Sequence, residues 1–108
     1  MTTPEGRVKN RVNRMLEKYG TRIYRFMPVQ MGMGKPGLDY FLCVNGHFIA
    51  VETKADNKQL TAVQQITRDV IQAAGGIVVE IHSIDDEAGF DQLQVFIHQA
   101  LMAPVLHT

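Results

Sequence analysis

The dipeptide Asn45-Gly46, set between two runs of β-forming residues, limits more than any other feature what this chain can fold into. The runs cover residues 38–44 and 47–54. A two-residue type I′ turn requires positive φ at both central positions, and Asn followed by Gly accepts this readily. We therefore predict a β-hairpin in which Val44 pairs with His47 and every later pair follows in the same register.

This register sets Asp39 directly opposite Glu52, and the alternation of side chains along a strand places Lys54 on the same face as Glu52. Directly opposed residues have Cβ atoms about 4.5–5.5 Å apart, so two carboxylates there repel each other. A divalent cation would compensate them, and Mg²⁺ is usually held by one or two carboxylates together with waters and phosphates. We predict Asp39 and Glu52 as metal ligands, with the backbone carbonyl of Thr53 as a further ligand. Lys54 would orient a metal-bound water or stabilise charge that develops in a transition state.

The same residues have a simpler interpretation, which the sequence leaves open. A carboxylate pair at a strand end can be a solvated rim, with Lys54 as a surface counter-ion. The other residues of this face are apolar, and we expect them to face the core: Phe41, Cys43, Phe48 and Ala50. The lone Cys43 excludes an internal disulfide and would serve as a small apolar filler.

The composition is that of an ordinary globular domain. The 108 residues suffice for one domain with a modest core, and 45% are hydrophobic and 20% charged. No run approaches the ~20 apolar residues of a membrane-spanning helix, and the start has no apolar signal-peptide region. The four histidines and one cysteine do not have zinc-ligand spacing, so we do not expect a zinc site.

Charge is distributed unevenly along the chain although the net charge is zero. Residues 1–36 contain eight Lys or Arg against two Glu, which gives +6, and residues 37–108 contain three against nine Asp or Glu, which gives −6. A basic block indicates contact with a polyanion, and an ordinary solvated helix face is the alternative. The basic residues that we predict to contact nucleic acid are Arg7, Arg11, Arg14, Lys35 and Lys58.

Residues 4–19 are predicted to form the first helix, with Thr3 as its N-cap and Gly20 as its stop. Glu5 lies at the edge of the apolar stripe of this helix. Two interpretations remain open for it. Its carboxylate either complements the positive helix N-terminus or reaches inward to a metal or its waters.

Residues 61–74 are predicted to form a second helix. Thr61 and Gln64 have the spacing of a capping box, in which Gln64 would bond back to the Thr61 amide, and this is the structural explanation for Gln64. The apolar residues that recur at helical spacing on one side of this helix are Val63, Ile66, Val70 and Ala73.

Two further strands are predicted at residues 22–29 and 77–82. The second is an apolar run bounded by turn signals, which suits a strand buried on both faces. The glycine-rich segment 30–37 is predicted to be a loop, and its spacing is not that of a phosphate-binding P-loop. The resulting fold class is α/β, with a small mixed sheet flanked by helices.

Asp85-Asp86-Glu87 suits the start of a third helix. Its apolar stripe is larger than so small a core needs, so we predict that it forms part of a homodimer interface. The alternative is that this helix simply covers one face of the sheet. The stripe consists of Phe90, Leu93, Phe96, Ile97 and Leu101, with Val95 beside it.

This order of elements resembles the core of the PD-(D/E)xK nucleases, which is a restriction-endonuclease-like fold. Glu52-Thr53-Lys54 corresponds to the ExK element, and Gly37-Leu38-Asp39 stands where the family usually has Gly-x-Pro-Asp. The segment 60–64, Leu-Thr-Ala-Val-Gln, is similar to the Leu-Ser/Thr-x-x-Gln segment of the VRR-NUC branch, and Glu5 is the candidate for the acid on that branch's first helix. The resemblance covers about residues 4–82. Leu38 replaces the usual proline and Thr53 the usual aliphatic residue, and neither change removes a predicted ligand.

The resemblance implies a nuclease that hydrolyses phosphodiester bonds of DNA with Mg²⁺ or Mn²⁺. It implies that the carboxylates of Asp39 and Glu52 and the carbonyl of Thr53 bind the metal and that Lys54 positions the attacking water. Glu5 and Gln64 would act in the outer shell or at a second metal. Single-domain members of this branch resemble phage or bacterial homodimers that act on branched DNA such as Holliday junctions, which implies a role in replication or repair in the bacterial or host cytoplasm.

Two other classes of protein remain possible on this sequence. A non-catalytic nucleic-acid-binding module would keep the fold and the basic helix without cutting, and its binding would be indifferent to metal. A structural phage protein without a nucleic-acid role is disfavoured by the uneven charge.

Overall fold

The predicted hairpin is present and forms the centre of a mixed four-stranded sheet. The computed structural model describes residues 2–28 and 37–106. Asn45 and Gly46 have φ of 50° and 81°, as a type I′ turn requires. Val44 pairs with His47, and the pairing continues in that register to the pair of Tyr40 with Val51. The predicted register is therefore confirmed.

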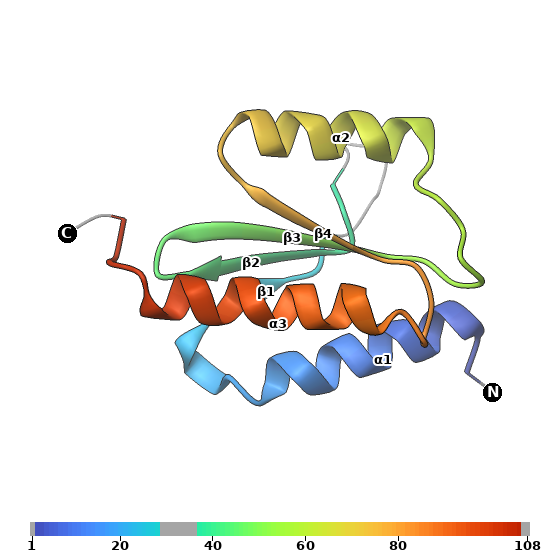
Figure 1. Ribbon diagram of the computed structural model, residues 1–108, viewed down its shortest axis with the longest axis horizontal. Helices are drawn as coiled ribbons and strands as arrows, with labels where there is room; N and C mark the ends of the chain where they lie inside the picture. Colours follow the sequence, from blue (N-terminus) through green and yellow to red (C-terminus); the bar gives the residue numbers. More distant parts are fainter. Residues whose placement is uncertain (1, 29–36, 107–108) are drawn as a thin grey trace.

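The elements follow the order expected for an α/β domain (Figure 1). The sheet has the order β1-β2-β3-β4, in which β1, β2 and β3 are antiparallel and β4 is parallel to β3. Within the described ranges, no helix is long and apolar enough to cross a membrane. The elements are α1 (Pro4–Glu17), a 3₁₀ turn η1 (Gly20–Arg22), β1 (Tyr24–Phe26), β2 (Tyr40–Val44), β3 (His47–Thr53), α2 (Ala62–Ala73), β4 (Ile77–Ile81) and α3 (Glu87–Met102).

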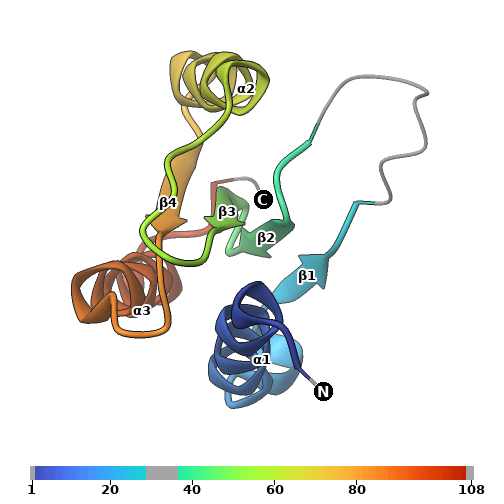
Figure 2. The ribbon, with the colours of Figure 1, turned by 90° about the vertical axis from the view of Figure 1, so that its right-hand side faces the viewer.

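Helices lie on both faces of the sheet, but unequally. Figure 2 shows α1 and α3 on one face and α2 alone on the other. The core lies between the sheet and the α1–α3 pair, and the strand residues that point into it alternate along β2 and β3 as the pleat requires. The main core residues are Val8, Val12, Leu16, Tyr40, Leu42, Val44, Ile49, Val51, Val79, Ile81, Phe90, Leu93 and Ile97.

The ends of the helices are fixed by the residues that their sequences indicate. Thr3 Oγ1 accepts from the Gly6 amide at 3.0 Å, so the predicted N-cap of α1 is confirmed. Thr61 and Gln64 form the predicted capping box of α2. Asp86 caps α3 by accepting from the Gly89 amide at 3.0 Å. The first helix ends at Glu17, two residues before the predicted end.

The hairpin turn also holds the end of α3. The Asn45 side-chain amide donates to the carbonyls of Ala100 and Leu101, at 3.1 and 3.0 Å. These carbonyls belong to the last turn of α3, whose C=O groups have no partner within the helix. Asn45 thus fixes the turn and satisfies the helix end at the same time.

The core-facing side of the hairpin is opposite to the one that we predicted. Cys43 is exposed and Phe48 is 41% exposed, whereas Tyr40, Leu42 and Val44 are buried. Both alternating sets of residues in these strands are apolar, and α1 and α3 pack on the set that begins with Tyr40. The expectation that Cys43 fills the core is therefore wrong.

The apolar stripe of α2 is also not buried. Val63, Ile66 and Val70 are 55%, 64% and 58% exposed, and no residue of α2, which is described in full, is buried. The side of α2 that faces the sheet instead contains Gln64, Arg68 and the half-buried Ile71. The strand at 77–81 is likewise less covered than predicted, because β4 lies at the sheet edge and only its Val79 and Ile81 are buried.

The stripe of α3, in contrast, belongs to the core. Phe90, Leu93 and Ile97 are buried against the sheet and α1, while Val95 and Met102 point to solvent. The structure thus agrees with the alternative in which α3 covers one face of the sheet. The residues of this stripe, which we predict for a dimer interface, belong to the core or pack against it.

Arg11 joins α1 to α3. Its guanidinium donates to both carboxylate oxygens of Glu87 at 2.8 and 2.7 Å and to the Ile84 carbonyl at 3.0 Å, and it lies 3.8 Å from the centre of the Phe90 ring. The ion pair lowers the pKa of Glu87. The guanidinium thus packs α1 against α3, and contact of Arg11 with nucleic acid stays a prediction.

A pair of substitutions on α3 tests the assignment of its faces. Leu93→Ala should lower the free energy of unfolding by about 2–5 kcal/mol, because it removes fully buried methyl groups from the core. Val95→Ala, at a 50% exposed position two residues away, should change it by less than about 0.5 kcal/mol. Urea denaturation followed by circular dichroism measures both. Equal losses would mean that both sides of α3 are covered.

Candidate active site

Four of the predicted site residues meet at the end of the hairpin. Asp39 lies one residue before β2, opposite Glu52 of β3, and its amide donates to Glu52 Oε1 at 3.0 Å. Gln64, in the first turn of α2, donates from Nε2 to Glu52 Oε2 at 2.6 Å. The Lys54 ammonium lies 3.9 Å from the same oxygen. The register of the hairpin and the start of α2 therefore bring these side chains to one place.

Thr53 fixes the carboxylate of Asp39. The Thr53 amide and hydroxyl both donate to Asp39 Oδ2, at 2.9 and 2.6 Å, and Thr53 is fully buried. Two donors on one oxygen hold the side chain in a single orientation and leave Oδ1 directed elsewhere. The Thr53 hydroxyl therefore helps to orient the Asp39 carboxylate. The role of the Thr53 carbonyl as a metal ligand stays a prediction.

The Glu52 carboxylate lies in a buried environment that disfavours its charged form. It is only 2% exposed, and burial raises its pKa to about 7, with the negative charge of Asp39 as the second cause. The hydrogen bond from the Asp39 amide and the charges of Lys54 and Lys9 oppose this rise. The repulsion predicted from the register is present, but the loss of solvent contributes more than the repulsion. A group with this pKa exchanges its proton near neutral pH.

Gln64 is both a helix cap and a site residue, so the two explanations are not alternatives. Its Oε1 accepts from the Thr61 amide at 2.9 Å, and the Gln64 amide donates to Thr61 Oγ1 at 3.2 Å. Once the carbonyl oxygen of the side chain is used in this way, its NH₂ group is directed away from Thr61 and toward Glu52. The capping box thus aims the donor at the carboxylate.

Lys9 is a residue of this site that the sequence did not reveal. Its ammonium lies 3.8 Å from Asp39 Oδ1, and its backbone carbonyl accepts from the Tyr40 hydroxyl at 3.3 Å. Tyr40 also donates to Asn13 Oδ1, and burial raises its pKa to about 12, so it remains a proton donor. The only signal for Lys9 was its spacing, one helical turn after Glu5, on the side of α1 that meets β2.

Glu5 is exposed in the first turn of α1. Among the described residues it forms no hydrogen bond or ion pair, and its spacing places it beside Lys9 on the helix surface. At this position its carboxylate interacts favourably with the positive N-terminus of the helix. Its action on a metal stays a prediction.

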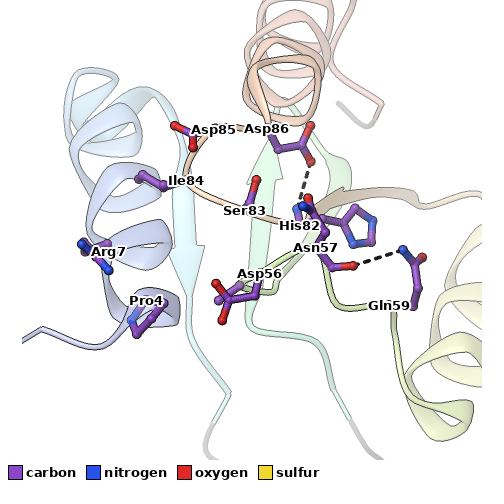
Figure 3. Close-up of a pocket in the computed structure, with 11 residues that line it drawn as sticks. Pro4, Arg7, Asp56, Asn57, Gln59, His82, Ser83, Ile84, Asp85 and Asp86 are labelled. Carbon is purple, nitrogen blue, oxygen red and sulfur yellow. Dashed lines mark hydrogen bonds between the residues drawn. The ribbon is translucent and has the colours of Figure 1, made fainter.

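The remaining basic candidates are not gathered at one place, because Arg7 and Arg14 line different hollows. Arg7, Arg14 and Lys58 are exposed, and Lys35 lies outside the described residues. Arg7 lines a hollow of about 690 Å³ between the N-terminus of α1 and the loops that follow β3 and β4 (Figure 3). None of Asp39, Glu52 or Gln64 lines this hollow. Among the described residues the buried carboxylate is Glu52, so the candidate site is the carboxylate pair and not this hollow.

The carboxylate pair fits a hard divalent cation. Within the described ranges, no three His, Cys, Asp or Glu side chains gather as a metal-binding group. Two carboxylates are nevertheless enough for Mg²⁺, which keeps several waters, whereas zinc usually takes at least three protein ligands. A bound cation would lower the pKa of Glu52 and reduce its repulsion with Asp39.

Comparisons of the chain with protein-family models, with curated proteins and with solved structures find no match. A functional assignment therefore depends on the chemistry of the residues that the fold brings together.

The stability of the metal-free protein should fall as the pH rises from about 4.5 to 7. In this window the folded state keeps a proton on Glu52 that the unfolded state has already lost, so raising the pH favours unfolding. The loss should be on the order of 3 kcal/mol, from about 1.4 kcal/mol per pKa unit. Urea denaturation in EDTA at a series of pH values measures it.

Asp39→Asn should make that slope shallower, because the Asp39 charge contributes to the raised pKa. Asp91→Asn, at an exposed position on α3, should leave the slope unchanged. If the wild-type free energy of unfolding were flat or rose across this window, Glu52 would not hold its proton in the folded state.

Gln64→Glu should keep the capping box and disturb the site. Glu completes a capping box as well as Gln does, but it places a second anion where Nε2 now donates to Glu52. In EDTA at pH 8 we expect a loss of about 1–2 kcal/mol, or roughly 5–15 °C in Tm. Millimolar Mg²⁺ should recover most of the loss.

The matched control is Gln72→Glu, which adds the same charge at an exposed position on α2. It should shift Tm little and respond no more to Mg²⁺ than the wild type does. A Gln64→Glu variant with wild-type stability and wild-type response to Mg²⁺ would leave Gln64 as a cap alone.

Proposed function

We propose that this protein is a metal-dependent nuclease with a restriction-endonuclease-like core, similar to the VRR-NUC branch of the PD-(D/E)xK class. The observation that carries this proposal is the buried Glu52 carboxylate, to which the Asp39 amide and the Gln64 side chain donate and beside which Lys54 lies. A structural role does not require two acids, a lysine and an amide to converge on one strand end. Metal-dependent hydrolysis of a phosphodiester can use such a set, with the acids on the metal and the lysine beside the attacking water.

Asp39 and Glu52 would hold Mg²⁺ or Mn²⁺, with the Thr53 carbonyl as a further ligand. When bound, the ion supplies Lewis acidity and lowers the pKa of a coordinated water. Thr53 orients the Asp39 carboxylate through its amide and hydroxyl, and the Asp39 amide orients Glu52 in turn. The protein thus preorganises both carboxylates before any ligand arrives, so little rearrangement is needed at the moment of reaction.

Lys54 would position the attacking water and stabilise negative charge as the phosphate becomes five-coordinate. Its side chain is 15% exposed, so its ammonium acts in a partly desolvated setting where a charge is worth more than in water. Gln64 and Glu5 would act in the outer shell or at a second metal. Lys9 contributes a second positive charge beside Asp39.

The proposed substrate is DNA, and we propose branched DNA, such as a Holliday junction, in phage or bacterial replication or repair. The exposed cations Arg7, Arg14 and Lys58 support contact with phosphates, together with Lys35. A homodimer would supply the two cuts that a symmetrical junction requires, because a twofold axis sets two sites on strands of opposite polarity.

Cleavage assays on linear, nicked, flap and four-way-junction DNA test this function. With Mg²⁺ or Mn²⁺ the wild type should cut at least one of these substrates, and EDTA should abolish cleavage. Asp39→Asn, Glu52→Gln and Lys54→Ala should each lower the rate by about 10²–10⁴-fold. Thr53→Val keeps the amide donor but loses the hydroxyl, so it should lower the rate by about tenfold.

Asp91→Asn serves as the control, because it removes an exposed carboxylate far from the site. Binding of every DNA with equal affinity in Mg²⁺ and in EDTA, without cleavage of any, would contradict the nuclease and support a non-catalytic binding module. Binding that does not weaken with salt would exclude both.

A further inference from the structure

Part of the sheet face that bears the carboxylate pair is open and aromatic. Figure 2 shows α2 above β4 on this face, with β1 at the other edge of the sheet. A hollow of about 410 Å³ lies on the β1 side, lined by Tyr24, Phe26, Phe41, Leu42, Cys43 and Phe48. Tyr24, Phe26 and Phe48 are 68%, 50% and 41% exposed. An exposed patch of apolar rings of this kind marks an interaction site.

The hollow lies directly beside the carboxylate pair. Residues that pair across the strands form rows on one face of the sheet, and successive rows on that face are two residues apart. The rows, in order along this face, are Tyr24–Cys43–Phe48, Phe26–Phe41–Ala50 and Asp39–Glu52. A strand rises about 3.4 Å per residue, so the two aromatic rows lie about 7 and 14 Å from the row of acids.

The lining of the hollow suits a flat, uncharged ring. None of the residues that line it is charged, so it offers no partner for a phosphate. Phe41 and Phe48 contact each other, with ring centroids 5.1 Å apart, which restrains both rings. A cavity of about 150 Å³ already binds benzene, so this hollow has room for a nucleobase. Bases stack on aromatic side chains whatever their identity, because every base has a π-face.

We propose that this surface, which we call the aromatic hollow, binds an unpaired nucleobase of the strand whose phosphate lies at the carboxylate pair. The inference rests on the proposed function for the place of that phosphate, and it narrows the class of substrate. Nucleotides of a stacked strand rise about 3.4 Å each, so a base about two to four nucleotides from the phosphate reaches the aromatic rows, and a nearer one does so in an extended strand.

A base inside a duplex cannot occupy the hollow, because its faces are covered by its neighbours in the stack. The substrate must therefore have a single-stranded segment or an unstacked nucleotide beside the cut. A protein side chain is the other kind of occupant that fits an apolar hollow. The continuity of the aromatic rows with the row of acids favours the base, because a strand held at the acids brings its neighbouring bases to this face.

Binding of a short oligothymidylate, followed by fluorescence anisotropy in EDTA, tests the proposal. The matched ligand is the same chain with an abasic residue at every position, which keeps all phosphates and removes all bases. The wild type should bind the oligothymidylate at least about tenfold more tightly, because one stacked base contributes about 5–100-fold in affinity. Rising salt should weaken both complexes and leave the ratio of their affinities unchanged, since only the phosphate contacts release counterions.

Variants of the exposed rings separate stacking from general apolar contact. Tyr24→Leu and Phe26→Leu keep an apolar side chain and lose the ring, so each should reduce the ratio to about twofold or less. Both positions are at least half exposed, so the fold and its circular dichroism should persist. Val95→Ala, on α3 at the opposite face, is the control and should keep the wild-type ratio.

Phe26→Trp should preserve the ratio, because it replaces one ring by another. The chain contains no tryptophan, so the fluorescence of this variant reports on the hollow alone. Oligothymidylate should quench it, and the abasic chain should not.

The single cysteine supplies a measurement on the unmodified protein. Cys43 is exposed and lies in the middle of the outer aromatic row. Saturating oligothymidylate should therefore slow its alkylation by a maleimide at least about tenfold, as expected for a covered side chain. The abasic chain should leave the rate unchanged.

Cleavage in Mg²⁺ tests the place of the hollow relative to the acids. One abasic residue within about four nucleotides of the cut should slow cleavage about tenfold, and a distant one should not. Equal affinity for the two oligonucleotides, or a ratio that Phe26→Leu and Tyr24→Leu leave intact, would overturn the aromatic hollow even if DNA is cut. Discrimination between the oligonucleotides that depends on these rings, without cleavage of any DNA, would contradict the nuclease alone.

Discussion

The pairing of Val44 with His47 across the Asn45-Gly46 turn is the constraint on which the rest of this structure depends. A slip of one residue would move every side chain of the shifted strand to the other face of the sheet. Asp39 and Glu52 would then no longer face each other, and the core residues of that strand would face α2. The Asn45 side chain strengthens this register by donating to the last turn of α3. The docking of a core helix and the geometry of the candidate site are thus set by the same turn.

The candidate site is an arrangement in which each polar group restrains the next. Thr53 holds Asp39, the Asp39 amide holds Glu52, and Gln64 reaches Glu52 from a helix cap. Burial of Glu52 is costly for folding, as its raised pKa indicates. Hydrogen bonds from two donors offset part of that cost, and a cation between the carboxylates would offset more. Such a site is more stable with its ligand than without it.

The sequence predicted those features that depend on neighbouring residues. The turn, its register and the capping box at Thr61 follow from local backbone chemistry, and the meeting of Asp39 with Glu52 follows from the register. The sequence failed to predict which face of the hairpin would be covered, because both alternating sets, beginning with Tyr40 and Phe41, are apolar. Long-range packing decides that question. The approach of Lys9 to Asp39 and the use of Arg11 by Glu87 join elements far apart in the chain, and no local pattern indicates such contacts.

The weak burial of α2 has a consequence for how the molecule moves. A helix without a buried side chain is held to the sheet mainly by its polar contacts, from Gln64 to Glu52 and from Arg68 to Glu80, with Ile71 half-buried beneath it. Such a segment opens at a small fraction of the free energy of global unfolding, because few apolar contacts are lost. One of its two polar anchors is the carboxylate of the candidate site. Because Gln64 in the first turn of α2 donates to Glu52, protonation of Glu52 would weaken this contact, so the order of this helix is linked to the chemistry of the candidate site.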